Sequence, residues 1–137
     1  MLMGSFEIKS GTPSVEEFLD LRGSVDMGTR SLEGVKRGLG NELFGALLYL
    51  RDSGELVGMG RVVGDGGTVF HICDMVVKPE WQRKGGGAMI MDALMEFIEG
   101  LGISDAYVNL IADVDGFYEK WGFKPTRPRS KGMFLKS

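Results

Sequence analysis

The spacing of hydrophobic positions changes along the chain, and each change predicts a different element. Residues 6–10 alternate apolar and polar side chains, which is the pattern of a short strand. Residues 12–23 place apolar side chains at helical spacing, with Thr12 or Ser14 as the N-cap and acidic residues in the first turn. Residues 31–40 repeat this pattern less clearly and predict a second, weaker helix.

From residue 44 onward the pattern becomes that of strands. Residues 43–52 and 55–64 are mostly apolar and are joined by the turn sequence DSGE. A second, glycine-rich turn leads into residues 68–78, which are almost continuously apolar and therefore predict a central strand covered on both faces. Together the three segments predict an antiparallel meander.

The second half of the chain predicts a long helix, a strand and a short helix. Apolar side chains recur between Ile90 and Leu101 at the spacing of one face of an amphipathic helix. Residues 105–112 then predict a strand, residues 113–123 a short helix, and residues 131–137 a last edge strand.

These elements predict one mixed α/β domain over residues 1–137. A strand, a helix and a strand follow one another from Thr68 to Leu110, and such a crossover places two strands parallel beside the meander. We therefore expect a single mixed sheet of about six to seven strands, with an antiparallel meander, a parallel pair and helices on both faces.

Composition and charge exclude several classes of protein. The chain is 43% hydrophobic and carries a net charge of −3, so it lacks the basic surface that nucleic-acid binding requires. No apolar run approaches the roughly 20 residues of a membrane span. The initial sequence, MLMGSFEIKSG, lacks the basic and apolar regions of a secretory signal, which predicts a cytoplasmic protein. A single His and a single Cys argue against a metal site, and Cys73 is interpreted as a small core residue.

Three consecutive glycines, Gly85 to Gly87, stand where the long helix begins. Glycine inside regular structure costs about 0.5–1 kcal/mol relative to alanine, so this run requires an explanation. A strand, a tight glycine loop and a helix N-terminus form an anion site, because the first N–H groups of the helix point outward. Arg83 and Lys84 add positive charge, and a pyrophosphate is the expected ligand. The alternative is a flexible turn with two solvated basic residues.

Two short motifs resemble the signatures of one known family. Residues 82–87 read QRKGGG and fit the motif Q/R-x-x-G-x-G/A of the GNAT superfamily of acyl-CoA-dependent N-acyltransferases. The preceding MVVKPEWQ resembles the strand and the V-x-P-x-x-(Q/R) approach of that family. Residues 116–125 read GFYEKWGFKP and resemble its second signature, F-Y-E-K-x-G-F. The matched positions run from Asp74 to Pro125, and the predicted order of elements agrees with the family over the whole chain.

The resemblance implies a binding site for acetyl-CoA as co-substrate, without a metal. It places the pyrophosphate of coenzyme A on Gln82, Arg83, Lys84, Gly85, Gly86, Gly87 and Ala88. It places the pantetheine arm along the strand before the loop, in contact with Met75, Val76 and Val77. The neighbouring parallel strand is expected to splay away and open a slot for the ligand. Many relatives carry an Asn before the signature Tyr where this chain has Ile111, and the nearest Asn here is Asn109.

The implied chemistry is the attack of a primary amine on the acetyl thioester. Tyr118 corresponds to the tyrosine that the family places beside the sulfur and is interpreted as the general acid; the alternative is that it only covers a short helix. Asp74 is our candidate for the general base, because desolvation in an apolar strand raises the pKa of a carboxyl group. Asp74 equally suits a structural role as a hydrogen-bond acceptor. His71 and a chain of water molecules are the other candidate bases.

The sequence does not identify the acceptor. We expect the first two helices, their connecting loop and the meander turns to select it, with Arg30 meeting a carboxylate or phosphate and Asp65 or Asp74 meeting an amine. Small amines, amino-sugars, antibiotics, peptide N-termini and protein lysines all fit.

The sequence leaves one alternative function open, disfavours a second, and suits one state of assembly. A non-catalytic acyl-CoA-binding or sensing module is the alternative function. A nucleotide-binding regulator is disfavoured, because no Ser or Thr follows the glycine loop to bind magnesium. Relatives often form dimers, and residues 132–136, GMFLK, suit the contact of a homodimer.

Overall fold

The computed structural model describes residues 5–137 and contains one five-stranded sheet within that range. The strands are β1 (Phe6–Ser10), β2 (Phe44–Leu50), β3 (Leu56–Gly64), β4 (Val69–Val77) and β5 (Tyr107–Leu110). The α-helices are α1 (Val15–Gly23), α2 (Leu32–Gly38) and α3 (Gly86–Gly100), and the short 3-10 helices are η2 (Pro79–Trp81) and η3 (Tyr118–Trp121). Within these residues, no helix has the length and apolar character needed to cross a bilayer.

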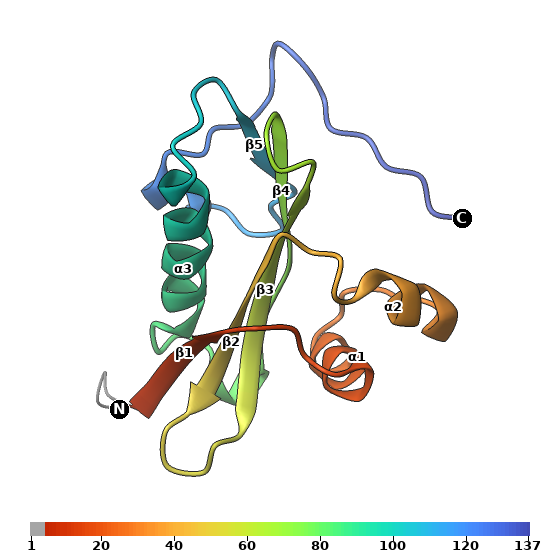
Figure 1. Cartoon of the computed structure of the whole chain (residues 1–137), viewed down its shortest axis with the longest axis vertical. Helices are drawn as coiled ribbons and strands as arrows, with labels where there is room; N and C mark the ends of the chain where they lie inside the picture. The colour runs from red at the N-terminus through yellow and green to blue at the C-terminus, as the bar shows by residue number, and fades with distance from the viewer. Residues whose placement is uncertain (1–4) are drawn as a thin grey trace.

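The strands lie side by side in the order β1-β2-β3-β4-β5 (Figure 1). The first four strands pair antiparallel with their neighbours, whereas β4 and β5 pair parallel. The long helix α3 forms the crossover between the two parallel strands. The predicted meander, crossover and parallel pair are therefore confirmed, and β4 is a central strand as its apolar sequence predicts.

The prediction of six to seven strands is wrong, because the described residues form five. Residues 131–137, predicted as a last edge strand, pair with no other strand in the described chain. After η3 the chain leaves the sheet and runs toward the side of α2 (Figure 1). A strand needs a paired neighbour to be stable, and the described residues give this segment none.

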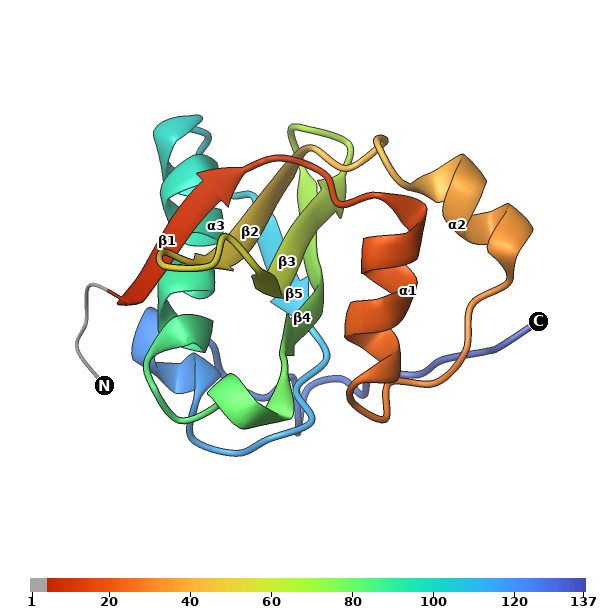
Figure 2. The same cartoon turned by 90° about the horizontal axis from the view of Figure 1, so that it is seen from below.

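Helices cover both faces of the sheet. Figure 2 shows α3 on one face and α1 with α2 on the other. The face under α3 holds the larger apolar cluster, in which Ile90 and Leu94 pack with Phe70 of β4. On the opposite face, Phe18 and Leu21 of α1 pack against β3 and β4. Each fully buried side chain of this size contributes about 1.5–3 kcal/mol of transfer free energy, so both layers are held firmly on the sheet.

Capping side chains fix the start of both helices on the α1 face. The hydroxyl of Ser14 accepts from the N–H of Glu17, and the carboxylate of Glu17 accepts from the N–H of Ser14, which completes a capping box. Thr12, the other candidate cap, instead donates to the carboxylate of Glu42 at 2.7 Å. Ser31 caps α2 by accepting from the N–H of Gly34.

Gly86 allows α3 to approach the sheet closely. A Cβ atom at this position would lie 2.6 Å from Cδ2 of Leu48 and 3.6 Å from Cε2 of Phe6, so only a hydrogen fits there. We expect Gly86→Val to lower the free energy of unfolding by about 1–3 kcal/mol, as overpacked cores do. Urea unfolding followed by circular dichroism measures this loss. Gly100→Val, at the open far end of α3, is the control, and an equal loss in both variants would contradict the packing role.

Candidate functional site

Among residues 5–137, the C-terminal half of β4 has no partner strand on one side. The pairing of β4 with β5 ends at Ile72 and Leu110, although β4 continues to Val77. Residues 73–77, the open segment of β4, keep β3 as their neighbour on the other side. Peptide groups that face away from β3 are therefore available to an extended ligand that adds itself as a strand. The predicted pantetheine contacts all lie in this open segment: Met75, Val76 and Val77.

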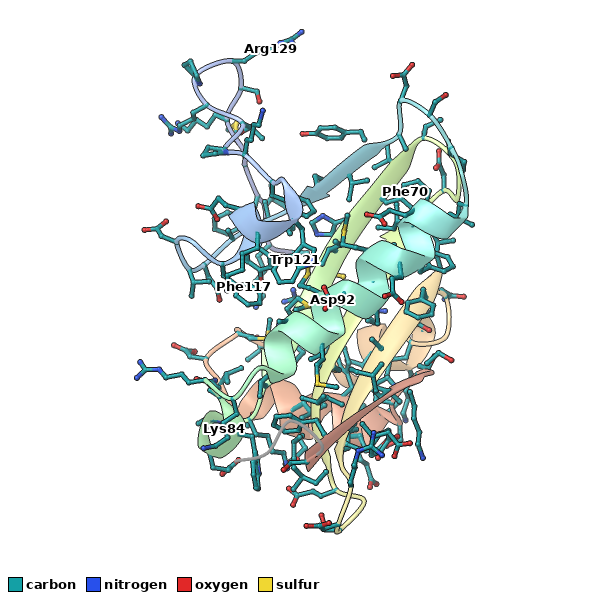
Figure 3. All side chains as sticks on the ribbon, turned by 90° about the vertical axis from the view of Figure 1, so that its left-hand side faces the viewer. Phe70, Lys84, Asp92, Phe117, Trp121 and Arg129 are labelled. Atoms are coloured by element: carbon teal, nitrogen blue, oxygen red, sulfur yellow. The ribbon has the colours of Figure 1, made fainter. Side chains whose placement is uncertain are left out.

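The glycine loop presents the N-terminus of α3 to solvent. Gly85 adopts a left-handed conformation with φ +89°, and a Cβ atom there would meet open space. Among residues 5–137, no side chain caps α3, so the N–H groups of its first turn have no side-chain acceptor. A Cβ atom on Gly87 would lie 3.3 Å from Cζ of Phe117. Arg83 and Lys84 are exposed, and Figure 3 shows Lys84 beside the start of α3.

The other residues of the predicted pyrophosphate site have separate positions. Gln82 donates from Nε2 to the carbonyl oxygen of Val77 at 2.9 Å, which joins the loop to the end of β4. Gly86 is buried against the core, and Ala88 is half-buried in the first turn of α3. The open segment of β4 and the uncapped helix terminus are therefore adjacent. This adjacency suits a ligand with an extended arm and an anionic group at one end.

An aromatic group holds η3 against α3. Phe117 packs edge-on against Tyr118 and at a tilt against Trp121, with ring centroids 5.0 and 5.1 Å apart. Trp121 donates from Nε1 to Oδ1 of Asp92 at 2.9 Å, and Figure 3 shows Phe117, Trp121 and Asp92 together beside α3. The short helix predicted here is confined to η3. Because Phe117 also lies against Gly87, the group places Tyr118 near the glycine loop.

Tyr118 combines a buried ring with a hydroxyl whose pKa is raised. The residue is 8% exposed, and its burial, together with the negative charge of Asp113, raises the pKa of the hydroxyl above 10.0. Every fully buried side-chain polar atom of residues 5–137 has a hydrogen-bond partner, whereas the hydroxyl of Tyr118 has none in that range. The raised pKa keeps the hydroxyl protonated at neutral pH.

Asp74 lies at a β-bulge in β4 and is buried in ion pairs. Its φ of +55° is unusual for a residue with a side chain, and the register with β3 shifts at this point. Arg22 of α1 donates from Nη1 to Oδ1 at 2.5 Å, and Arg61 of β3 donates from Nε to Oδ2 at 2.9 Å. The carboxylate is 7% exposed. Both oxygens are occupied, which favours the structural interpretation, and the role of general base stays a prediction.

The ion pairs of Asp74 belong to a network that the sequence did not predict. Arg61 also donates from Nη1 to Oε1 of Glu42 at 3.1 Å, and the Glu42 side chain is 4% exposed. Burial raises the pKa of Glu42, but hydrogen bonds from Thr12 and Arg61 outweigh this effect and hold the pKa below its usual value. The buried ion-pair network therefore consists of two carboxylates and two guanidinium groups: Arg22, Glu42, Arg61 and Asp74.

Three further polar candidates lie on β4 and β5. Nδ1 of His71 and Oδ1 of Asn109 are 2.6 Å apart across the paired part of the two strands. The candidate base His71 is therefore hydrogen-bonded to Asn109, the Asn closest in sequence to position 111, where many relatives carry Asn. Burial, with the negative charge of Asp74, raises the pKa of the Cys73 thiol to about 12, which leaves it protonated. In the described part of the chain, no three His, Cys, Asp or Glu side chains are grouped to hold a metal ion.

A cavity of about 870 Å³ lies on the sheet face that carries α1 and α2. Arg61 and Asp74 form its floor, α2 and the loop before it form one wall, and residues 134–137 form another. Lys136 donates from Nζ to the carbonyl oxygen of Thr29 at 2.8 Å and to its hydroxyl at 3.1 Å, which holds the C-terminal segment across this face.

Comparisons with known proteins match most of the chain. A family model described as "Acetyltransferase (GNAT) domain" matches residues 36–134. An uncharacterised N-acetyltransferase of Pyropia yezoensis is 32% identical over 120 residues, which cover 86% of this chain and 69% of that protein. A crystal structure of a probable acetyltransferase of unknown function from meticillin-resistant Staphylococcus aureus is 40% identical, with a TM-score of 0.90 over 96% of this chain and 99% of that one. A GNAT-family acetyltransferase of Streptococcus pneumoniae TIGR4 is 28% identical, with a TM-score of 0.75 over 96% and 98%.

Proposed function

Because the chain belongs to the GNAT family of acetyltransferases, we propose that it moves the acetyl group of acetyl-CoA to a primary amine. Membership confirms the predicted family and the predicted class of enzyme, an acyltransferase. The observation that carries the finer proposal is the adjacency of two features in the described part of the chain: residues 73–77 of β4 have no partner strand on one side, and the N-terminus of α3 has no side-chain cap.

We assign the two parts of coenzyme A to these two features. The pantetheine arm pairs with the open segment of β4, residues 73–77, which has no partner strand on that side among the described residues. The pyrophosphate lies on the first turn of α3, where the N–H groups and the helix dipole favour an anion. Gly85 leaves room for this approach because it has no side chain, and Arg83 and Lys84 add positive charge beside it.

The transfer needs one proton acceptor and one proton donor. The nitrogen of the neutral amine attacks the carbonyl carbon of the thioester; a C–N bond forms, the C–S bond breaks, and the amine proton passes to solvent. We propose water as the acceptor of that proton, because both oxygens of Asp74 are bonded to arginines. Tyr118 donates its proton to the departing thiolate and regains one from solvent. Its raised pKa keeps it protonated until that step.

Gly85→Val tests the pyrophosphate site. The added side chain fills the open space over the helix terminus and blocks hydrogen bonds to a charged ligand, which contribute about 1.5–3 kcal/mol each. The loss of two such bonds should weaken acetyl-CoA binding by about 100-fold or more. Isothermal titration calorimetry measures it. The matched control is Gly102→Val, which places the same side chain at another open glycine with positive φ beyond the far end of α3. Equal affinity for acetyl-CoA in both variants would contradict the assignment of the pyrophosphate site.

The same titration separates the alternative functions. ATP with magnesium is the second titrant, and binding of ATP without binding of acetyl-CoA would favour a nucleotide-binding regulator. An amine panel followed by thiol release comes next. A non-catalytic acyl-CoA-binding module would bind acetyl-CoA and release no thiol with any amine.

Location and assembly belong to the proposal as well. We propose a cytoplasmic protein that forms a homodimer through its C-terminal segment. Met133, Phe134 and Leu135 support the second part, because they are consecutive, apolar and more than four-fifths exposed, at 84%, 94% and 91%.

A further inference from the structure

The cavity of about 870 Å³ meets the open segment of β4 at Asp74. Asp74 lines the cavity and lies just beyond Ile72, the last residue of β4 that pairs with β5. A ligand in the cavity therefore lies beside the open segment of β4, to which the pantetheine arm is assigned. Phe18, Val35 and Leu39 line the cavity too, so it accepts a ligand with an apolar as well as a polar part.

The floor of the cavity offers no free carboxylate to a cationic ligand. Asp74 accepts from Arg22 and Arg61, and Glu42 accepts from Arg61. Two carboxylates thus face two guanidinium groups, and the buried ion-pair network is neutral as a whole. Because both oxygens of Asp74 are already bonded to arginines, an ammonium ion would find no free anionic partner at the floor, and desolvation there disfavours its protonated form. The acceptor nitrogen should therefore bind as the neutral amine, the form that attacks a thioester.

The rim of the cavity, in contrast, carries two positive charges without acidic partners. Arg30 donates from Nη1 to the carbonyl oxygen of Thr29 at 3.0 Å, and Lys136 donates to the carbonyl and the hydroxyl of the same residue. Neither cation forms an ion pair with any residue in the range 5–137. A guanidinium group offers two parallel donors that match a carboxylate or a phosphate. Arg30 and Lys136 thus offer an anion two positively charged partners at the rim.

We propose that the acceptor is a small amine that also carries an anionic group, a carboxylate or a phosphate. This inference rests on the proposed function and names its class of substrate. Arg30 binds the anionic group, Lys136 adds a second charge, and the nitrogen reaches the floor at Asp74, where the slot opens. The nitrogen forms its bond to the acetyl carbon, the C–S bond breaks, and the products are an N-acetylated anionic amine and the thiol of coenzyme A.

Matched pairs of amines test the proposal. O-phosphoethanolamine is compared with ethanolamine, and tyrosine with tyramine, because the members of each pair differ in the anionic group. The full chain with acetyl-CoA should show kcat/KM at least about tenfold higher for the anionic member of one pair, since a charged hydrogen bond of this kind is worth about 1.5–3 kcal/mol. The pair that shows the preference distinguishes phosphate from carboxylate. A preference for ethanolamine and tyramine would overturn the proposal.

The variant Arg30→Ala tests whether Arg30 at the rim of the cavity causes the preference for anionic amines. This variant should lose most of the tenfold ratio, and its affinity for acetyl-CoA should stay that of the wild type. Arg37→Ala is the matched control, because Arg37 lies on α2, is exposed, and pairs with Glu33 outside the cavity. Equal ratios in the two variants would overturn the role of Arg30.

A binding measurement tests the anion site at Arg30 even when no amine of the panel is acetylated. O-phosphoethanolamine titrated into the 15N-labelled chain should shift the amide signals of residues 29–31, and Arg30→Ala should abolish these shifts. Absence of the shifts in the wild type would overturn the proposal. Calorimetry with acetyl-CoA reports separately on the proposed function: a chain that binds the phosphoamine at Arg30 but not acetyl-CoA would retain the anion site and lose the acetyltransferase assignment.

Discussion

Asp74→Ala should lower the free energy of unfolding by about 3–5 kcal/mol, the usual loss when one partner of a buried ion pair is removed. The substitution leaves Arg22 without its carboxylate in a place where the arginine side chain is 4% exposed. Arg61 keeps only Glu42. The loss therefore comes mainly from an uncompensated buried charge, and to a smaller extent from the removed hydrogen bonds.

Urea unfolding of the wild type and of Asp74→Ala under identical conditions measures the difference in their free energies of unfolding. Glu33→Ala is the control, because it breaks the exposed ion pair between Glu33 and Arg37, whose worth is about 0.3–0.5 kcal/mol for this helical spacing. A loss for Asp74→Ala that matches this control would show that the buried ion-pair network contributes little, and the structural interpretation of Asp74 would then fail.

Asp74→Asn decides between the structural and the catalytic interpretation. Asparagine keeps one acceptor oxygen and tolerates the left-handed conformation, yet it cannot accept a proton from the amine. If the carboxylate is structural, the folded variant should retain turnover and lose stability. A folded variant whose turnover falls by about 100-fold or more, with the loss of the acidic limb of the pH profile, would instead establish Asp74 as the base.

The sequence predicted the meander and the crossover because both depend on local patterns. The mostly apolar strand segments, the turns between them and the amphipathic helix each specify one element, and the chirality of crossovers then leaves few arrangements. The prediction of an edge strand at residues 131–137 was wrong because it too depended on local pattern alone. The apolar and basic residues there have strand-like composition, but a strand also needs a partner, and no strand of the described residues pairs with this segment.

The sequence predicted the glycine loop but not the surroundings of Asp74. The motif at residues 82–87 is continuous, so its place at a helix terminus could be read directly. The buried ion-pair network joins residues 52 positions apart, from Arg22 to Asp74, and its geometry depends on a β-bulge that no local pattern reveals. One signal was present: an arginine within a helix that packs on the sheet requires a buried acidic partner, and Asp74 was the carboxylate available in the apolar strand.

Tyr118→Phe should reduce turnover by about 100-fold or more, the usual contribution of a general acid, and leave acetyl-CoA affinity unchanged. Only one oxygen atom is removed, and that hydroxyl has no hydrogen-bond partner among residues 5–137, so the aromatic packing with Phe117 and Phe123 remains. Thermal unfolding of the variant should accordingly resemble that of the wild type. Tyr107→Phe, on β5 with 56% exposure, is the control for the loss of a tyrosine hydroxyl elsewhere.

The dependence of turnover on pH tests the acid role of Tyr118 most directly. The pKa of Tyr118 is raised above 10.0, so the hydroxyl holds its proton through the neutral range and loses it only in more alkaline solution. Turnover in the wild type should therefore rise with pH as the acceptor amine is deprotonated, and fall only above about pH 10 as Tyr118 ionises. In Tyr118→Phe the fall should be absent, because no acid remains to titrate. Undiminished turnover with an unchanged alkaline limb would mean that Tyr118 only covers η3, and the departing thiolate would then take its proton from water.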